Sequence, residues 1–466
     1  MEHFFHLKER GTTVQREIMA GLTTFMAMAY ILMVNAEIFS NLEGQVTYGA
    51  VYIATAVSAV FGTVLVGLLS NLPLAQATGM GLNAYFVFSV CFGIGLTYAN
   101  ALVLVLIDGV TFIILTATGL RKKIFDAIPA TVRVAIPAGI GLFIAFLGLQ
   151  NAGLVVDNEA TLVSLASFNL YAGNATWSSI MPMLVTFFAV LAISAMSARK
   201  VKGSVLYGIL GGSAAYYLLG FTIPGFYTGF AEKMSFSPLD SFGEFFRYSF
   251  CRVFREGFDF SPFIEANGVG SFLVMIVTTA LAFCTVDMFD TLGTLYGACA
   301  RGGLLDENGE VPRMDRAMMA DAAATVVGAV CGTSTVTTVV ESSAGVGEGG
   351  RTGLTSISTA CFFVAAMFLA PLAQLIPSCA TAAALIYVGV LMMACVKELD
   401  WTSPEVATPA FLTVIMMPFT YSIAFGIGFG LISYSVIAVL TGRKDEVKPA
   451  TWIIGGLFTL TFLLTH

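Results

Sequence analysis

The sequence predicts an all-α polytopic membrane protein, with about fourteen transmembrane spans in two inverted seven-span repeats. Composition is the first reason, because 57% of the 466 residues are hydrophobic and only 11% are charged. Soluble globular domains carry about 25% charged residues. The second reason is that apolar stretches long enough to cross a bilayer recur along nearly the whole chain. The third is a pair of polar interruptions at matching places in the two halves, which is typical of transporters built from repeats.

Apolar windows place seven spans in each half of the chain. Those of the first half are expected at residues 18–38, 48–69, 74–92, 99–118, 131–149, 179–197 and 203–222. Those of the second half are expected at residues 270–298, 315–332, 336–347, 353–376, 380–396, 405–421 and 422–441. The regions are then a first repeat (1–222), a polar extracellular loop (223–268), a second inverted repeat (269–441) and a C-terminal tail (442–466). The apolar stretch 451–464 in the tail is short for a span and suits the membrane interface.

Basic residues indicate the orientation of these spans. With the N-terminus in the cytoplasm, the short loops that carry lysine and arginine all fall on the cytoplasmic side. These residues are Arg121, Lys122, Lys123, Arg199, Lys200, Lys202, Arg301, Arg313, Arg351, Lys397, Arg443 and Lys444. The long outer loop holds Lys233, Arg247, Arg252 and Arg255, and long loops cross membranes largely regardless of their charge. Because seven is odd, the second half enters the membrane in the opposite orientation, as an inverted repeat requires.

Several classes of protein are disfavoured. The N-terminal segment lacks the apolar core and cleavage site of a signal peptide, so we expect it to be retained. The many apolar spans lead us to expect a multi-pass protein of the plasma membrane, or of the inner membrane in a bacterium. The eight cysteines lack the spacing of metal sites, and the three histidines stand near the chain ends. Without a nucleophile, metal or cofactor motif, we expect no enzyme, no metal, no cofactor and no nucleic-acid partner. Proton coupling inside the membrane must then use carboxylates.

Two spans are interrupted. In the tenth, the β-branched run Thr335–Val340 is followed by a carboxylate, Glu341, and a glycine-containing stretch. In the third, the segment Pro73–Phe86 is comparably irregular. Lipid supplies no hydrogen-bond partners, so such segments persist at membrane depth only where they are buried in protein or line a cavity. The two breaks therefore predict a substrate site between them.

Two acids of the eighth span lie on one helix face, because Asp287 and Asp290 are three residues apart. Burial and mutual repulsion both disfavour two charges there, which suits groups that bind and release a proton during transport. The alternative is a structural role, in which these acids accept hydrogen bonds from neighbouring helix ends.

Further candidates come from the breaks. Glu341 can accept hydrogen bonds from ring N–H or amine groups of a neutral heterocycle, and Ser342 directly after it is a second candidate contact. Asn83 has both a donor and an acceptor for the recognition edge. The alternatives are that Glu341 only caps a helix and that Asn83 only satisfies backbone groups. Phe289 offers a face for a planar ligand, although aromatics make up 12% of the chain and the signal is weak.

Other intramembrane charges favour a structural reading. Asp321 has Arg316 nearby, and Asp108 stands alone in an apolar span. Either can also serve as a coupling relay. Glu348 and Arg351 are expected to pair at the cytoplasmic end of the tenth span.

Four motifs together resemble the AzgA-like purine permeases of the nucleobase:cation symporter family, the xanthine/uracil permeases. They are Ala20–Leu32, Gly79–Phe86, Asp287–Thr294 and Gly332–Val346. The resemblance covers nearly the whole chain. It implies a uracil-permease-like architecture with a core and a gate domain, in which short strands of the broken third and tenth spans meet at mid-membrane. It also implies uptake of adenine, guanine or hypoxanthine with protons, sodium being less expected, and a homodimer formed through the gate domain.

The resemblance also implies roles for particular residues. The base-binding acid of the eighth span falls on Asp290, with Asp287 one turn earlier, the acid of the tenth span on Glu341 and the asparagine of the third on Asn83. Phe425 departs from the polar or small residue expected at its position, which concerns the gate.

The hypothesis from sequence is therefore a proton-coupled importer of purine nucleobases. One rival is an anion transporter of the same architecture, with sulfate or bicarbonate held at half-helix N-termini. Three acids facing one cavity argue against that rival. A passive channel is a second rival, and the repeat symmetry with two breaks argues against it.

Overall fold

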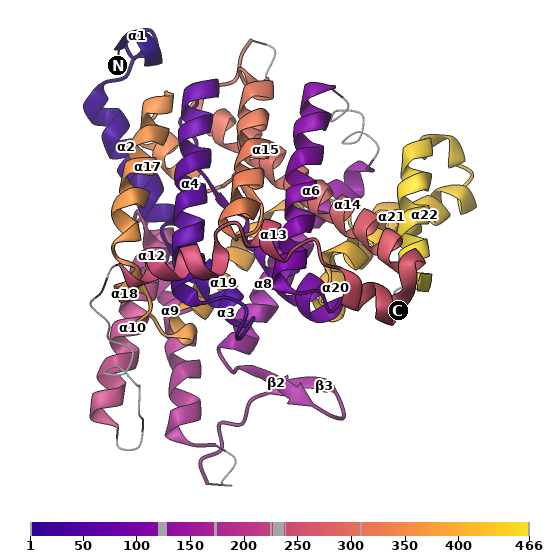
Figure 1. Cartoon of the computed structure of the whole chain (residues 1–466), viewed down its shortest axis with the longest axis horizontal. Coiled ribbons are helices and arrows are strands. Elements are labelled where there is room, and N and C mark those ends of the chain that lie inside the picture. Colours follow the sequence, from indigo (N-terminus) through magenta and orange to yellow (C-terminus); the bar gives the residue numbers. More distant parts are fainter. Residues whose placement is uncertain are drawn as a thin grey trace.

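The computed structural model describes residues 2–119, 128–171, 175–223, 226, 237, 239–307 and 310–464, and these residues are mostly helical (Figure 1). The α-helices are α1 (Glu2–Phe5), α2 (Val14–Met28), α3 (Tyr30–Ser40), α4 (Tyr48–Ser70), α5 (Met80–Ala84), α6 (Tyr98–Ala117), α8 (Ala130–Asn151), α9 (Trp177–Ala198), α10 (Ser204–Thr222), α12 (Asp240–Glu244), α13 (Arg252–Arg255), α14 (Ser261–Gly302), α15 (Met314–Cys331), α16 (Ser342–Gly347), α17 (Gly353–Met367), α18 (Ala370–Ala373), α19 (Ser378–Met392), α20 (Pro404–Thr420), α21 (Ile423–Leu440) and α22 (Pro449–Leu464). Two π-helical segments, η1 (Tyr85–Gly93) and η2 (Phe245–Ser249), and two 3₁₀ turns, η3 (Met393–Glu398) and η4 (Lys444–Glu446), complete the helical elements. The strands are β1 (Gln76–Thr78), β2 (Val155–Asn158), β3 (Leu162–Leu165) and β4 (Val336–Thr338).

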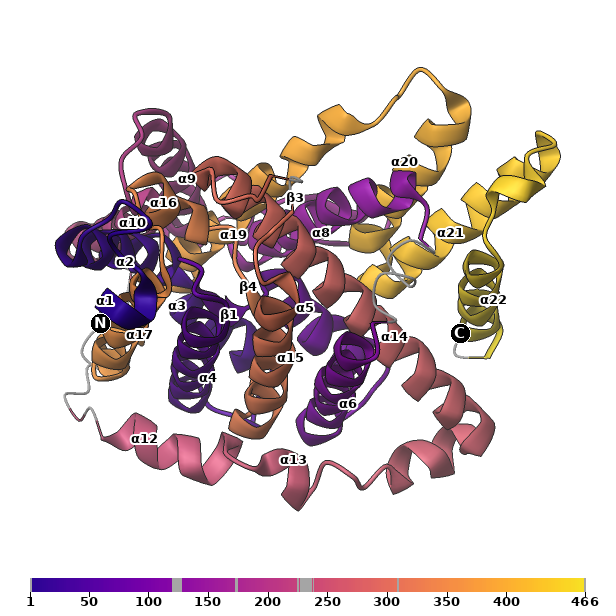
Figure 2. The ribbon, with the colours of Figure 1, turned by 90° about the horizontal axis from the view of Figure 1, so that it is seen from above.

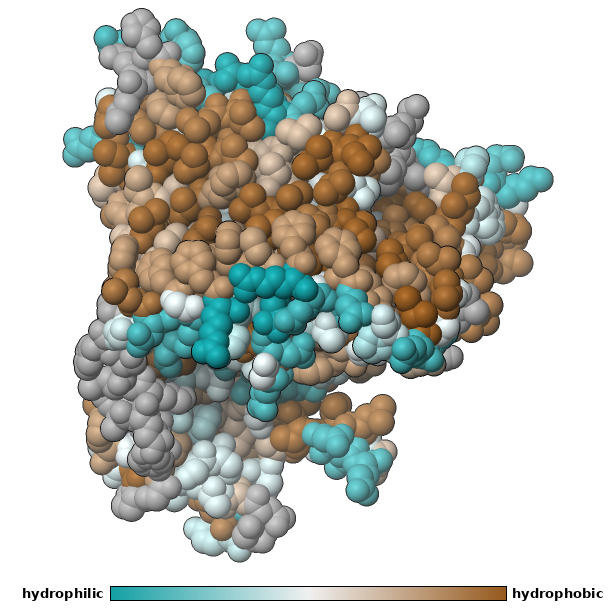
Figure 3. All heavy atoms as spheres, viewed as in Figure 1, coloured by the Kyte–Doolittle hydropathy of each residue, from teal (hydrophilic) through white to brown (hydrophobic). Residues whose placement is uncertain are grey.

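Long apolar helices make this a multi-pass membrane protein. Among the described residues, nine helical stretches are long and apolar enough to cross a bilayer, and they coincide with nine of the predicted spans. The other predicted spans contain shorter or less apolar elements, so the total number of spans stays a prediction. A broad band of apolar side chains covers the face shown in Figure 3, bordered by hydrophilic residues above and below. Water-soluble proteins rarely expose so large an apolar surface, and lipid explains it.

The breaks in the third and tenth spans are paired strands. β1 and β4 are antiparallel, with Gln76 opposite Thr338, Ala77 opposite Thr337 and Thr78 opposite Val336. All six residues are buried. Each strand leads into a short helix, β1 into α5 and β4 into α16. This confirms that short strands interrupt these two spans, and Figure 2 places them near the centre of the molecule beside α4 and α15.

Two threonines hold the first residue of each strand in the same way. The Thr63 hydroxyl of α4 accepts from the Gln76 N–H at 2.9 Å and donates to the Gln76 carbonyl at 3.0 Å. The Thr325 hydroxyl of α15 accepts from the Val336 N–H at 3.2 Å and donates to the Val336 carbonyl at 3.0 Å. Each hydroxyl thus satisfies both backbone groups of a buried strand residue.

The long helices form two packed groups around this strand pair. Helices α8, α9, α10, α19, α20 and α21 pack on one another, while α2, α4, α6, α14, α15 and α17 pack against each other and the strands. Figure 2 shows α8, α19, α20 and α21 on one side of the strand pair and α4, α6 and α15 on the other. Inside the first group, Gly141 of α8 faces Gly389 of α19 so closely that a Cβ at Gly389 would lie 2.4 Å from the Gly141 carbonyl oxygen. Small residues of this kind allow helices to touch along their backbones in membranes.

The outer loop and the tail hold more structure than the sequence indicated. Helices α12, η2 and α13 lie in the region 223–268, and α14 already begins there at Ser261, with a non-helical residue at Gly268. This segment runs past α4, α15 and α6 (Figure 2). The Asn100 side-chain amide stabilises the position of this segment by donating to the carbonyls of Gly257 and Asp259 at 2.8 and 2.9 Å. In the tail, the predicted apolar stretch is the helix α22, which packs on α21 and α14.

Some charged residues pair differently from the prediction. Glu348 forms an ion pair with Lys202, between α9 and α10, and not with Arg351. The Arg351 side chain donates instead to the carbonyls of Val346 and Gly350 at 2.9 and 2.8 Å. The predicted pairing with Arg351 is therefore wrong, because Glu348 pairs with Lys202 while Nη1 of Arg351 donates to these two carbonyls. The predicted cytoplasmic cations Arg121, Lys122 and Lys123, and the outer Lys233, lie outside the described residues.

A valine at Gly389 tests the contact between α8 and α19. The added side chain would overlap the Gly141 carbonyl, and overpacking of this kind costs about 1–3 kcal/mol. We expect Gly389→Val to unfold at a lower temperature than wild type when both are purified in detergent. The matched control is Gly211→Val in α10, where no heavy atom lies within 4 Å of the added Cβ. Equal unfolding temperatures for the two variants would contradict the close contact.

Candidate substrate site

The two strand ends bring two short helices together. Beyond the pairs of the β1–β4 ladder, the Gly79 N–H donates to the Thr335 carbonyl at 3.3 Å and the Val339 N–H donates to the Ala75 carbonyl at 3.2 Å. The Ser342 hydroxyl at the start of α16 accepts from the Ala75 N–H at 3.0 Å and donates to its carbonyl at 3.2 Å. Residues far apart in sequence are thereby fixed around one point. The Ser342 hydroxyl, a predicted substrate contact, is occupied by this backbone in the structure.

Glu341 occupies the N-cap position of α16, but its side chain makes no capping hydrogen bond. Its Oε1 atom instead accepts a hydrogen bond of 2.6 Å from the Tyr30 hydroxyl. Tyr30 is buried at the start of α3, where the first span changes from α2 to α3. The sequence reasoning assigned no role to Tyr30, although a hydroxyl-bearing residue inside the apolar motif Ala20–Leu32 was an available signal.

Asp290 reaches the same point from α14. A Cβ atom placed on Gly79, at the end of β1, would lie 3.3 Å from Asp290 Oδ2 and 3.2 Å from the Thr337 Cγ2 atom of β4. The carboxylates of Glu341 and Asp321 both act on Asp290 electrostatically. The predicted acids of the eighth and tenth spans thus lie close enough to interact, and Gly79 leaves room for Asp290 because it has no side chain.

Asn83 lies on α5, directly after β1. It is fully buried, and its Nδ2 atom donates to the Thr78 hydroxyl at 3.2 Å. Its Oδ1 atom has no hydrogen-bond partner in the part of the chain that the structure describes. A buried acceptor without a partner is rare in proteins and often marks a functional position. The side-chain amide thus keeps one acceptor available close to the strand ends.

Asp321 anchors the strand pair. Its Oδ1 atom accepts from the Thr338 N–H at 3.0 Å and from the Gln76 side-chain amide at 3.2 Å, while Oδ2 accepts from the Thr291 hydroxyl at 2.7 Å. One carboxylate of α15 therefore joins β1, β4 and α14. The expected partner Arg316 is exposed at the start of α15 and does not take part, so the reason predicted for a structural Asp321 is wrong.

The remaining predicted residues are Asp287, Asp108 and Phe289. Asp287 is fully buried one turn before Asp290, and Asp108 is fully buried on α6, which packs against α14 and α15. The side chain of Phe289 lies outside the described part of the structure. Among the described residues, no three histidine, cysteine or acidic side chains lie close enough together to hold a metal ion.

This arrangement suits a small neutral ligand rich in hydrogen-bonding groups. Glu341 and Asp290 accept hydrogen bonds, Asn83 offers an acceptor, and the Tyr30 hydroxyl holds Glu341 in place. The ligand classes that this chemistry favours are heterocycles with N–H and amine groups. An anion would meet two carboxylates here, which disfavours it.

Comparison with known proteins places the chain among transporters. A sequence profile of the Permease family matches residues 15–429. The guanine/hypoxanthine permease PbuG of Bacillus subtilis is 40% identical over 99% of this chain and 99% of its own length. The adenine permease AdeP of Escherichia coli is 37% identical over 99% of this chain and 95% of its own. A putative permease of Methanocaldococcus jannaschii is 40% identical over 99% and 98%.

Solved structures support the fold. The transmembrane domain of the cyanobacterial bicarbonate transporter BicA superposes with a TM-score of 0.60 at 15% identity, covering 88% of this chain and 96% of that domain. The anion transporter Slc26a9 of mouse gives a TM-score of 0.58 at 13% identity, covering 92% of this chain and 68% of that one. At such low identity these matches show a shared fold and nothing about the substrate.

Replacing Asp321 tests its role as an anchor. Asp321→Ala leaves the buried donors of Thr338, Gln76 and Thr291 without this partner, and each unsatisfied donor costs about 1–3 kcal/mol. We expect a clearly lower unfolding temperature in detergent than for wild type. Glu265→Ala, an exposed acid of α14, serves as the control and is expected to unfold like wild type. If both variants unfold at the same temperature, Asp321 does not hold the strands.

Proposed function

The chain belongs to the xanthine/uracil permease family, and we propose that it imports purine nucleobases by coupling their movement to protons. Adenine and guanine/hypoxanthine permeases are among the relatives with similarity over nearly their full length. The observation that carries the proposal is the meeting of Asp290 and Glu341 at the ends of β1 and β4. The expected substrates are adenine, guanine or hypoxanthine, taken up across the plasma membrane.

The site residues fit a purine in the following way. The Glu341 carboxylate accepts hydrogen bonds from a ring N–H or exocyclic amine, and the Tyr30 hydroxyl at 2.6 Å keeps that carboxylate oriented. The Oδ1 atom of Asn83 accepts a further hydrogen bond. Ser342 contributes through its position rather than its hydroxyl, which holds the Ala75 backbone. Phe289 is the proposed face for stacking.

Proton coupling is assigned to Asp290 and Asp287. Asp290 stands close enough to Glu341 and Asp321 for their charges to act on it. A proton on Asp290 removes one of these charges, which lowers the energy needed to move the site through a low-dielectric region. Asp287 is fully buried one turn away and is the second candidate carrier. Asp108 is proposed to relay the proton, and a sodium ion is less expected than a proton.

The wider architecture is also part of the proposal. The matching contacts of Thr63 with Gln76 and of Thr325 with Val336 support two inverted repeats, residues 1–222 and 269–441, that contribute one strand each. The group containing α2, α4, α6, α14, α15 and α17 is the proposed core domain. The group containing α8, α9, α10, α19, α20 and α21 is the proposed gate domain. We place the N-terminus in the cytoplasm and the region 223–268 outside, and propose a homodimer formed through the gate domain.

An anion transporter remains the alternative function, and its support is weaker. The structural relatives with that activity share the fold at 13–15% identity. A sulfate or bicarbonate ion between Asp290 and Glu341 would be repelled by both carboxylates. The relatives with 37–40% identity are instead purine permeases or a putative permease.

Uptake assays with single variants test the proposed site. In cells that lack their own purine permeases, we expect saturable, protonophore-sensitive uptake of labelled hypoxanthine or adenine by the wild type. Asp290→Asn and Glu341→Gln each remove a charged hydrogen-bond acceptor, an interaction worth about 1.5–3 kcal/mol. We therefore expect uptake to fall by about tenfold or more. Glu265→Gln, on the exposed surface of α14, is the control and should transport like wild type.

Each variant must be present in the membrane at the level of wild type. Normal purine uptake by Asp290→Asn and Glu341→Gln would remove these acids from the site. Failure of the wild type to take up any purine, with uptake of bicarbonate or sulfate instead, would replace the proposed function by the alternative.

A further inference from the structure

A cavity of about 380 Å³ lies between α14, η1 and the start of α21. Its volume is within the range of about 300–1,000 Å³ that is typical of small-molecule sites. The cavity is lined by the first half of α14, which in the proposed topology is the outer end of the eighth span, and by the turn between α20 and α21. None of Glu341, Asn83 and Tyr30 lines it.

The walls of this cavity combine ring faces with polar groups. Phe263, Tyr421 and Phe425 supply aromatic surface, and Asn267 and Ser271 supply hydrogen-bonding groups. Planar heterocycles are held by such a mixture, because rings stack on the faces while edges find donors and acceptors.

Phe425, which departs from the residue expected from the family resemblance, is part of this wall. Phe425 packs edge-to-face against Phe462 of α22, with ring centroids 5.2 Å apart. Phe458 of the same helix lines the cavity. The C-terminal helix α22 thus helps to build the cavity wall.

One face of α14 leads from the cavity to one of the acids. Ser271, Met275 and Thr279 line the cavity at intervals of four residues. Continued by the same interval, this series reaches Phe283 and then Asp287. Each four-residue step turns about 40° around the helix, so Asp287 lies well away from the face of Ser271. Thr279, Phe283 and Asp290 are spaced by four and seven residues and do share one face of α14, which joins the cavity to one of the coupling acids.

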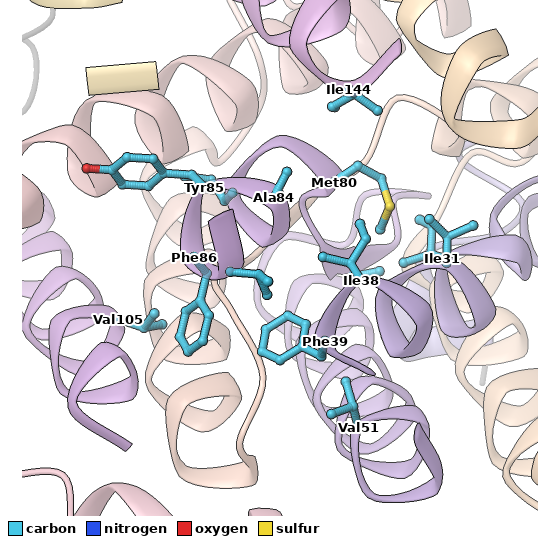
Figure 4. Packing of buried hydrophobic residues seen from close by; sticks show 14 of the residues in the cluster. Ile31, Ile38, Phe39, Val51, Met80, Ala84, Tyr85, Phe86, Val105 and Ile144 are labelled. Carbon is cyan, nitrogen blue, oxygen red and sulfur yellow. The ribbon is translucent and has the colours of Figure 1, made fainter. Parts of the chain in front are cut away.

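Along α14, Phe283 follows the cavity-lining Thr279 and precedes those acids, and its ring packs on a ring of the cavity wall. Tyr85 lines the cavity, and its ring packs edge-to-face on Phe283, with centroids 4.9 Å apart and an interplanar angle of 66°. Both side chains are almost fully buried. Figure 4 shows the Tyr85 hydroxyl pointing away from the cluster formed by Phe86, Phe39 and Ile38. Tyr85 also begins the π-helical segment η1, and π-helical turns are frequent at functional sites.

We propose that this cavity is an outer chamber in which a purine base binds before it reaches Asp287 and Asp290, and that the Tyr85–Phe283 ring pair is the gate between chamber and acids. The proposal rests on the proposed function. It adds a second binding position for the same planar, neutral substrate and assigns the residues that separate the two positions.

Filling the chamber tests the first half of the proposal. Ser271→Trp places an indole in the cavity, whereas Leu273→Trp places the same group on the outward face of α14, where Leu273 is 58% exposed. We expect Ser271→Trp to reduce the initial rate of hypoxanthine uptake by about tenfold or more, and Leu273→Trp to transport like wild type. Ser271→Cys adds a milder variant: an impermeant thiol reagent should block its uptake, and excess hypoxanthine should slow the modification. The Leu273→Cys protein is the control for reaction of the reagent with the native cysteines and with a cysteine outside the cavity.

Removing one ring tests the gate. We expect Phe283→Ala to admit hypoxanthine down its gradient at least as fast as wild type. We expect it to lose accumulation against the gradient, because the Tyr85–Phe283 ring pair can no longer close the way to the acids. Tyr85→Leu is the second variant, used if Phe283→Ala is absent from the membrane. Accumulation equal to wild type in the variant that folds would overturn the gate.

The outcomes distinguish failure of the outer chamber from failure of the proposed function. If wild type takes up purines and Ser271→Trp does so equally well, the outer chamber is wrong while the proposed function stands. If wild type takes up no purine, the proposed function itself fails. Modification of Ser271→Cys that neither blocks uptake nor responds to hypoxanthine would also overturn the chamber.

Discussion

The backbone of the two broken spans has to find its hydrogen bonds inside the protein, since lipid provides none, and the rest of the structure follows from how it does so. β1 and β4 satisfy each other across an antiparallel pair. The groups at the beginning of each strand are taken up by the hydroxyls of Thr63 and Thr325. Asp321 joins both strands to α14. The break is thereby a rigid, fully buried element rather than a loose interruption.

The chemistry of the site depends on this pairing. Because the strands are antiparallel, the chain leaves β1 toward Asn83 and leaves β4 toward Glu341, while α14 brings Asp290 to the glycine at the end of β1. Tyr30 of α3 donates to Glu341 at the start of α16, so polar side chains of separate segments meet in an otherwise apolar protein. In the proposed mechanism, one of these carboxylates takes up a proton while the other binds the base, which suits proton-coupled transport of a neutral heterocycle.

The helices and the two breaks could be predicted from short stretches of the sequence. The helices follow from apolar windows, and the breaks follow from the β-branched run before Glu341 and the irregular segment around Gly79, because both are read over a few neighbouring residues. Contacts between distant segments were not predictable in this way. The partners of Asp321 come from β1, β4 and α14, and Lys202 rather than Arg351 pairs with Glu348. Glu17 is a further case, since its buried carboxylate accepts from the Thr352 and Thr355 hydroxyls at 2.8 and 2.6 Å, which no local pattern indicates.

The most direct test of the central claim is calorimetric titration of the purified protein with hypoxanthine in buffers of different ionisation enthalpy, at a slightly alkaline pH. The dependence of the heat on the buffer gives the number of protons taken up with each base. We expect proton uptake on binding by the wild type and its loss in Asp290→Asn, with Glu341→Gln binding weakly or not at all. Tight hypoxanthine binding by the wild type without proton uptake would contradict the coupling. Tight binding by Glu341→Gln would contradict the site.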